Sequence, residues 1–279
     1  MGLGENCYIC NQIIDNKLSM RRFLLITMAL CVATTVLVAQ PKVIAHRGYW
    51  KAEGCAQNSI SSLRAAGELG CWGSEFDVWM TADGHLILYH DDKFEGRRVE
   101  ELTLKEMRLH RLENGEQLPL LEEFLRVAQE YPDLHLVFEL KAHNNKEQER
   151  KAVRASVAMI EAMGLAKRTD YICFSKDACV EFVAASPQAK VFFLSLTGAL
   201  SAEEIKDANL AGASYFHLFY RLFPRFIDRL HERGLEAGVW TVNNKGAMRW
   251  MMKHSLDYIT TDRPDVALTL AGIGKDTQD

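Results

Sequence analysis

The sequence lacks the features that separate a chain into several domains. Its 279 residues include only six prolines, and they contain no internal repeat, low-complexity tract or proline- or serine-rich linker. Hydrophobic residues make up 48% of the chain, which is enough to bury one large core. We therefore expect a single domain over residues 40–279, preceded by the N-terminal segment described below.

Cysteines that could form a disulfide framework are also lacking. Beyond residue 40 the chain has only Cys55, Cys71, Cys173 and Cys179. A helix is predicted between Cys55 and Cys71, and it would hold their Cα atoms roughly 20 Å apart, beyond the reach of a disulfide. We expect no structural disulfide framework, even in an exported protein.

The chain also lacks a strong positive net charge. The net charge of the chain is −4, and residues 1–39 contribute +1 of this, which leaves −5 for the remainder. Such a balance provides no basic surface for nucleic acid. An anionic small-molecule substrate would have to be attracted locally, by a metal ion or by a few arginines and lysines.

The N-terminus has the three parts of a secretory signal peptide. Two arginines are followed by an apolar run over residues 23–38 and then by Ala39, after which we expect cleavage. This run of 16 residues is short for a helix that spans a bilayer. We expect residues 1–19 to be an upstream extension and the mature protein to be secreted or periplasmic, with no stable membrane span. The alternative is that residues 20–39 remain as an uncleaved anchor.

Apolar strands alternate with amphipathic helices along the rest of the chain. Strands are predicted over 42–46, from 73, and over 134–141, 171–175, 190–195, 213–218, 236–243 and 257–262. Helices are predicted over 60–69, 103–109, 119–129, 146–163, 177–185, 201–210, 224–233, 245–254 and from 264. Eight repeats of strand and helix predict a (β/α)8 barrel of the TIM type. The alternative, a doubly wound open sheet, is disfavoured by this count and by the lack of a glycine-rich phosphate loop after the first strand.

The segment over residues 73–92 contains a hairpin that interrupts the repeat. Asp83-Gly84 is the dipeptide of a type I′ turn, so we expect residues 86–89 to fold back antiparallel to the second strand. The turn is too short for a parallel crossover. The hairpin is therefore a short cap insertion after the second strand, and it should bring His90 near the end of that strand.

Acidic side chains collect at the ends of two strands. Glu75 and Asp77 are two residues apart, and so share one face of their strand. Glu139 and Lys141 repeat this spacing on the next strand of the barrel. Ionised carboxylates side by side repel each other unless a cation lies between them. Three acidic ligands without a cysteine or histidine cluster favour Mg²⁺ or Ca²⁺ over zinc.

Two histidines lie at strand ends on the same rim. His46 ends the first strand and His90 follows the hairpin, so they could flank a metal-bound group as general base and general acid. Arg47 would offset the charge of a phosphate. The other histidines are expected to be surface or satisfied core residues: His85, His110, His135, His143, His217, His231 and His254.

These residues stand in motifs that resemble the glycerophosphodiester phosphodiesterase family. The motifs are Ile44-Ala45-His46-Arg47-Gly48, Asn58, Glu75-x-Asp77-Val78, Thr81-x-Asp83-Gly84, Leu88-x-His90-Asp91, Glu139-x-Lys141, Val239-Trp240-Thr241-Val242-Asn243 and Thr260-Thr261-Asp262-Arg263-Pro264. Their order is consistent over residues 42–270. The resemblance implies a (β/α)8 barrel that hydrolyses glycerophosphodiesters to sn-glycerol 3-phosphate and an alcohol.

The resemblance also implies roles for individual side chains. The ligands of a divalent cation, Mg²⁺ or Ca²⁺, would be Glu75, Asp77 and Glu139. The general acid and base would be His46 and His90, and the phosphate contacts Arg47 and Lys141. Trp240 would be a rim residue against the substrate, with an aromatic that only packs within the fold as the alternative.

Two departures from the family pattern bear on the substrate. Gln57 stands where the family usually has a glutamate, so one charge near the metal is lost. The segment over residues 93–112 is shorter than the usual cap and leaves a more open pocket. Such a pocket would also admit a lysophospholipid, as in a lysophospholipase D, or a phosphoinositol diester. A non-catalytic module that binds phosphodiesters is the alternative from another class.

Overall fold

The computed structural model describes residues 40–273, and its centre is a closed ring of eight parallel strands. They are β1 (Lys42–Ala45), β2 (Gly73–Met80), β6 (His135–Leu140), β7 (Thr169–Cys173), β8 (Val191–Ser195), β9 (Gly212–Phe216), β10 (Glu236–Trp240) and β11 (Tyr258–Thr261). The ring closes because β1 pairs in parallel with both β11 and β2. This confirms the (β/α)8 barrel, since an open sheet would leave two edge strands.

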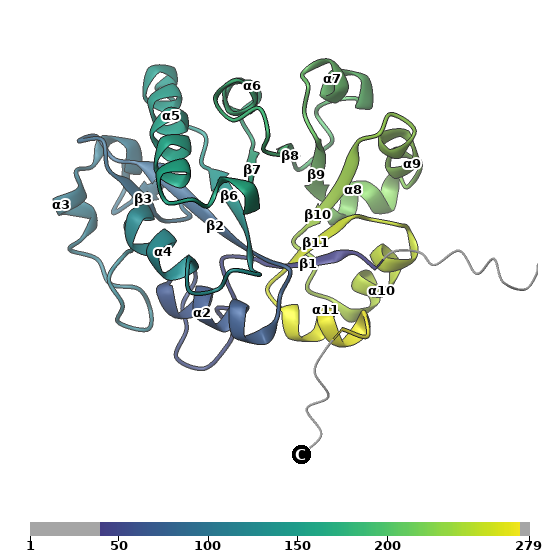
Figure 1. Ribbon diagram of the computed structural model, residues 1–279, viewed down its shortest axis with the longest axis horizontal. Helices are drawn as coiled ribbons and strands as arrows, with labels where there is room; N and C mark the ends of the chain where they lie inside the picture. Colours follow the sequence, from purple (N-terminus) through teal and green to yellow (C-terminus); the bar gives the residue numbers. More distant parts are fainter. Residues whose placement is uncertain (1–39, 274–279) are drawn as a thin grey trace, which may run out of the picture. The chain divides into compact units, whose positions relative to one another are not determined.

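Helices surround the ring and return the chain to the start of the next strand (Figure 1). They are α2 (Ile60–Leu69), α4 (Leu121–Ala128), α5 (Lys146–Ala162), α6 (Lys176–Ala185), α7 (Ala202–Asp207), α8 (His217–Leu222), α9 (Arg225–His231), α10 (Lys245–Lys253) and α11 (Pro264–Leu270). Local sequence sets several of their ends. Ser59 caps α2 and accepts from the amide of Ser62, while Gly70 ends that helix in the left-handed conformation.

The prediction differs from the structure at α8. A strand was expected over 213–218, but β9 ends at Phe216 and a helix begins at His217. Tyr220 of α8 is buried, and its ring lies 6.1 Å from that of Tyr215. Packing against the barrel therefore outweighs the β-propensity of this aromatic segment.

Strand alternation divides the core into two layers. On β2, Phe76 and Val78 point outward into the cluster shared with the helices, so Glu75 and Asp77 point into the barrel. On β6, Phe138 packs outward against rings from β2, β7 and α6. The barrel interior has its own cluster of Ile44, Val137, Ile172, Phe192, Leu194 and Tyr258.

The structure confirms the hairpin insertion, but the predicted type of its turn is wrong. β3 (Leu86–Leu88) pairs antiparallel with β2, and Val78 faces Leu88. A type I′ turn needs positive φ at both central residues. Asp83 does not have it, and only Gly84 is left-handed, with φ 84°. The turn is centred one residue earlier, because the amide of Gly84 donates to the carbonyl of Thr81, and the hydroxyl of Thr81 donates to the Asp83 carboxylate.

The rest of the insertion forms a small cap with its own core. Its elements are β4 (Lys93–Phe94), β5 (Arg97–Arg98), the 3-10 helix η1 (Val99–Glu101) and α3 (Leu104–Met107). Its apolar core consists of Trp79, Ile87, Val99, Leu102, Met107 and Leu118. A second 3-10 helix, η2 (Ala166–Arg168), precedes β7. The cap therefore packs on β2 and β3, beside the mouth of the barrel.

Two further expectations concern covalent links and membranes. Cys55, Cys71, Cys173 and Cys179 are all free thiols, as predicted. Within residues 40–273, the structure contains no helix both long and apolar enough to cross a bilayer. The predicted upstream extension and signal peptide lie outside the described residues.

We predict that Phe138→Ala lowers the free energy of unfolding by about 3–5 kcal/mol, because it leaves a cavity in the outer layer of the core. Urea denaturation followed by circular dichroism measures this change. Val180→Ala is the matched control, since Val180 on α6 is 47% exposed and its truncation should have little effect. Equal losses in the two variants would contradict the proposed packing.

Candidate active site

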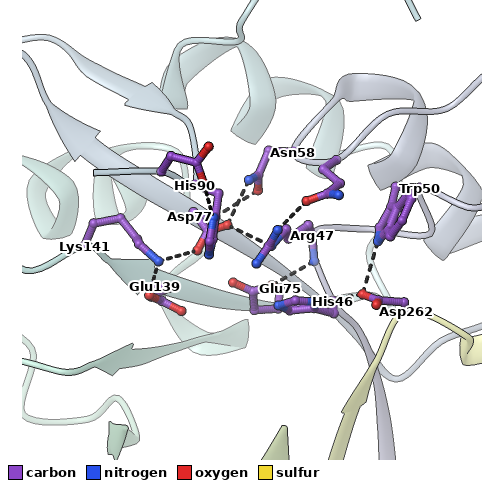
Figure 2. A network of polar contacts seen from close by, with 12 residues as sticks. His46, Arg47, Trp50, Asn58, Glu75, Asp77, His90, Glu139, Lys141 and Asp262 are labelled. Carbon is purple, nitrogen blue, oxygen red and sulfur yellow. Dashed lines mark hydrogen bonds and ion pairs between the residues drawn. The ribbon is translucent and has the colours of Figure 1, made fainter. Parts of the chain in front are cut away.

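Three carboxylates converge at the carboxyl end of the barrel (Figure 2). One oxygen each from Glu75, Asp77 and Glu139 lies within 4.8 Å of the other two. They come together because Asp77 on β2 is in register with Glu139 on β6, and Glu75 shares the inward face of β2. All three are buried, with exposed fractions of 1%, 1% and 7%.

Burial and repulsion act on these carboxylates unequally. Burial raises the pKa of Glu75 well above its ordinary value, and the charges of Asp77 and Glu139 raise it further. Burial opposes ionisation of Asp77 as well, but attraction to Lys141, His90 and Arg47 outweighs it and lowers the pKa to about 2. Burial raises the pKa of Glu139, against the attraction of Lys141.

The donor set fits a hard divalent cation. Glu75 Oε1 is buried and has no hydrogen-bond partner among the described residues, and the acidic groups nearest to it are two more carboxylates. A buried orphaned oxygen is costly unless something binds it. Three carboxylates without a nearby thiol offer only oxygen ligands, which Mg²⁺ and Ca²⁺ prefer. The cluster predicted from sequence is therefore present, and its chemistry suits those ions.

Lys141 holds two of the carboxylates in place. Its Nζ donates to Glu139 Oε1 at 2.7 Å and to Asp77 Oδ1 at 3.2 Å. These two partners raise the pKa of Lys141 although burial acts to lower it, so the side chain remains a cation. His143 Nδ1 lies 2.7 Å from the carbonyl of Lys141, which makes it the satisfied core histidine that was expected. A contact between Lys141 and phosphate stays a prediction.

Arg47 lies over the same cluster in a left-handed backbone conformation, with φ 55°. Its amide donates to Glu75 Oε2 at 2.7 Å, and its Nε is 3.5 Å from Asp77 Oδ2. Its guanidinium also donates to the side-chain oxygen of Gln57. The residue that replaces the family's glutamate thus orients Arg47. The amide group of Asn58 bonds Asp77 twice, through the carboxylate and the backbone N–H.

His46 is oriented by a carboxylate, Asp262, that stands in one of the family motifs but had no role predicted from the sequence. Its Nδ1 is 2.7 Å from Asp262 Oδ1, just beyond β11. Asp262 also accepts from Trp50 Nε1 at 3.2 Å and from Asn243 Nδ2 at 2.6 Å. Burial opposes ionisation of Asp262, but its hydrogen bond with His46 lowers the pKa to about 2. An ionised partner keeps the proton on Nδ1 and leaves Nε2 free.

His90 has a different environment on the cap side. Its Nδ1 is 2.7 Å from the exposed carboxylate of Asp91. Burial lowers the pKa of His90, and the positive charges of Lys141 and Arg47 lower it further against the opposing effect of Asp77. A hollow of about 330 Å³ lies beside it, lined by residues of the first loop, β3 and the cap. Its walls include Arg47, Gln57, Asn58, Tyr89, His90 and His110.

Trp240 ends β10 on another side of the mouth. Its Nε1 donates to the carbonyl of Ser214 at 2.9 Å, and its ring lies 5.4 Å from the rings of both Phe174 and Phe216. These contacts fix the indole as part of an aromatic group at the rim. A contact with substrate stays a prediction, because packing alone accounts for its position.

Comparisons with known proteins identify the family of the chain. The model of the glycerophosphoryl diester phosphodiesterase family matches residues 46–266. A glycerophosphodiester phosphodiesterase from Caldanaerobacter subterraneus is 26% identical over 83% of this chain and 98% of its own length. A crystal structure of such an enzyme from Parabacteroides distasonis is 43% identical, with a TM-score of 0.81 over 84% of this chain and 97% of that one.

A third similar protein is a phosphodiesterase from Oleispira antarctica, whose structure is a complex with the product sn-glycerol 3-phosphate. It is 22% identical, with a TM-score of 0.70 over 82% of this chain and 96% of that chain, and this likeness shows a shared fold. The family match extends from His46 at the end of β1 to Val266 in α11, and so includes every element that contributes to the acidic cluster. The chain belongs to the glycerophosphoryl diester phosphodiesterase family.

Proposed function

We propose that this enzyme hydrolyses glycerophosphodiesters to sn-glycerol 3-phosphate and an alcohol, with a divalent cation at Glu75, Asp77 and Glu139. The observation that supports this most is the buried acidic cluster between two histidines, each paired with its own carboxylate. The named relatives support the reaction class.

The charges of the site divide the work of binding and proton transfer. A bound Mg²⁺ or Ca²⁺ would supply positive charge to the phosphate oxygens. Arg47 lines the hollow beside His90, where it can meet a phosphate, whereas Lys141 is bound to Asp77 and Glu139. Lys141 thereby keeps Asp77 ionised, and its attraction opposes the effect of burial on the pKa of Glu139. Arg47 in turn depends on Gln57, which fixes its guanidinium.

The two histidines suit opposite roles in this proposal. The lowered pKa of His90 keeps it neutral near pH 7, so it can accept the proton of the oxygen nucleophile. His46 is oriented by Asp262, as the histidine of a catalytic triad is oriented by its carboxylate, and we assign it the transfer of a proton to the leaving alcohol. Asp262 is a positioning residue that acts through His46. The nucleophile is water or a hydroxyl of the substrate itself.

Two other activities would use the same site. Cleavage of a lysophospholipid or of a phosphoinositol diester needs the same cation and histidines but a different leaving group. A panel of diesters with product analysis separates these substrates. A protein that only bound phosphodiesters would show binding heat in calorimetry and no phosphate-ester turnover.

We predict that chelation removes activity and that Glu75→Gln does the same. In this variant the cluster loses a ligand, and turnover should fall about 100-fold or more. Metal-free Glu75→Gln should unfold at the same or a higher temperature than metal-free wild type, because a buried carboxylate with a raised pKa is removed.

Thermal unfolding with and without Mg²⁺ or Ca²⁺ distinguishes the two effects. Wild type should gain stability when the ion is added, whereas Glu75→Gln should gain little. Glu53→Gln is a control on the exposed first loop, and it should behave as wild type. Full activity of chelated wild type would exclude the metal role.

We predict that the two histidine variants differ in their dependence on the leaving group. His46→Ala should lose turnover about 100-fold or more with a glycerophosphodiester of an alkyl alcohol but little with a p-nitrophenyl ester, because that group leaves without a proton. His90→Ala should lose turnover with both substrates. The measurement is kcat on each ester. The reverse pattern would exchange the two roles.

We predict a bell-shaped dependence of kcat/KM on pH. The acidic limb reports protonation of the base, so it should lie below the ordinary histidine pKa of about 6.5, since the pKa of His90 is lowered. Asp262→Asn should lower kcat more with the alkyl ester than with the p-nitrophenyl ester, because Asp262 acts through His46. Equal losses with both esters would indicate that Asp262 has only a structural role.

We also propose that residues 20–39 direct export and are removed after Ala39. Residues 40–279 would then form the mature domain in the periplasm or outside the cell. N-terminal sequencing of the exported protein should begin at Gln40. Retention of the full chain in the membrane fraction would instead support the uncleaved anchor.

A further inference from the structure

Large apolar side chains are exposed on the side of the mouth away from the cap. Five of them follow three consecutive barrel strands, β7, β8 and β9, at their carboxyl ends. These residues, here called the apolar rim, are Phe174, Leu196, Leu218, Leu222 and Phe223. Leu222 is 73% exposed and Phe223 57%. Apolar side chains gathered in this way mark a surface that contacts a partner.

The short helix α8 explains why its apolar side chains point outward. Phe219 and Tyr220 pack against Tyr215 and Phe226 on the barrel side. Leu218 and Leu222 are one turn apart, and so share the opposite face of α8. That face covers no part of the core in residues 40–273, because both side chains are exposed.

The apolar rim is continuous with the active-site mouth. The ring of Phe174 lies 5.4 Å from that of Trp240, and the ring of Phe216, which precedes α8, lies at the same distance from Trp240 on another side. Trp240 stands on β10 at the end of the barrel where the acidic cluster lies. A partner bound to the apolar rim would therefore face the mouth.

Positive charge accompanies these apolar side chains. Arg221, Arg225 and Arg229 are exposed, and Asp228 is the one carboxylate between His217 and His231. Arg225 and Arg229 line a hollow of about 520 Å³ together with Leu222 and Phe223. Neither arginine forms an ion pair with another described residue. The segment is thus basic, although the net charge of the chain is −4.

We propose that the apolar rim docks on a phospholipid surface. Its apolar side chains insert at the boundary between the lipid headgroups and the acyl chains. Arg225 and Arg229, which line the hollow, contact lipid phosphates. A second copy of this chain fits less well, because a two-fold interface would place the same arginines opposite each other. Docked in this way, the enzyme faces the membrane with its active site, and it would take a diester from that surface. The proposal concerns binding and does not depend on the chemistry of the site.

The test is cosedimentation of the full chain with vesicles of phosphatidylcholine, with and without phosphatidylglycerol. The double variant Leu222→Ser/Phe223→Ser should lower the partition coefficient about tenfold or more, since two exposed apolar side chains no longer insert. Ile273→Ser is the matched control, because Ile273 is 55% exposed and follows the last helix, α11. It should bind as wild type does.

A second double variant tests the role of the arginines. Arg225→Gln/Arg229→Gln should weaken binding to vesicles that contain phosphatidylglycerol and should reduce the dependence of this binding on salt. Every variant should hydrolyse a short soluble diester at the wild-type rate, since none of these residues lies in the catalytic site. Loss of vesicle binding can therefore be distinguished from loss of turnover.

Hydrogen exchange locates the contact on the protein. Amides of residues 217–223 should exchange several-fold more slowly when vesicles are added, and those of residues 264–273 should not change. Equal vesicle binding by wild type and the Leu222→Ser/Phe223→Ser variant would overturn the proposal, as would unprotected amides in 217–223. So would a wild-type dimer that this variant converts to a monomer.

Discussion

Electrostatic repulsion among three buried carboxylates is the constraint on which the site depends. Glu75, Asp77 and Glu139 are placed together by strand register and alternation, which the hydrophobic core on the outer face of β2 and β6 enforces. Burial acts to raise the pKa of all three. Lys141 reverses this for Asp77, whose pKa falls to about 2, but Glu75 remains poorly compensated. The fold therefore leaves too little positive charge beside Glu75 to balance the three carboxylates.

The backbone of the first loop is strained where it places hydrogen-bond donors beside these carboxylates. Arg47 and Asn58 both have positive φ, which costs an arginine about 1 kcal/mol or more, whereas asparagine adopts this conformation more readily. Each is bonded to a different carboxylate, Arg47 to Glu75 and Asn58 to Asp77. Gly48 has φ 75°, and a Cβ there would overlap Ser62 of α2. Packing of the loop on α2 thus fixes the backbone that brings these donors to the cluster.

The sequence predicts those parts of the site that follow from strand periodicity. Spacing by two residues correctly places Glu75, Asp77 and Glu139 on the inner face of the barrel, because each strand has an apolar outer face. Asp262 was part of a recognised motif without an assigned role, since its contact with His46 spans 216 positions and local patterns carry no such information. The helix at His217 was missed for a similar reason, as the packing of Tyr220 decides it.

The two sides of the mouth offer unlike surroundings to the two ester arms of a phosphodiester. Charged and polar side chains from β1, β2, β6 and β11 lie on one side, whereas aromatic and aliphatic side chains follow β7 to β10 on the other. The acidic cluster would act on the phosphate that every such substrate shares. In the proposed function, we therefore expect discrimination among alcohols to arise from the polar hollow beside His90 and from the aromatic side chains around Trp240. Because these two surfaces differ in polarity, a substrate bound in the reverse orientation would place its apolar arm against the charged wall and its polar arm against the aromatic one. We expect that cost to favour one orientation of the substrate.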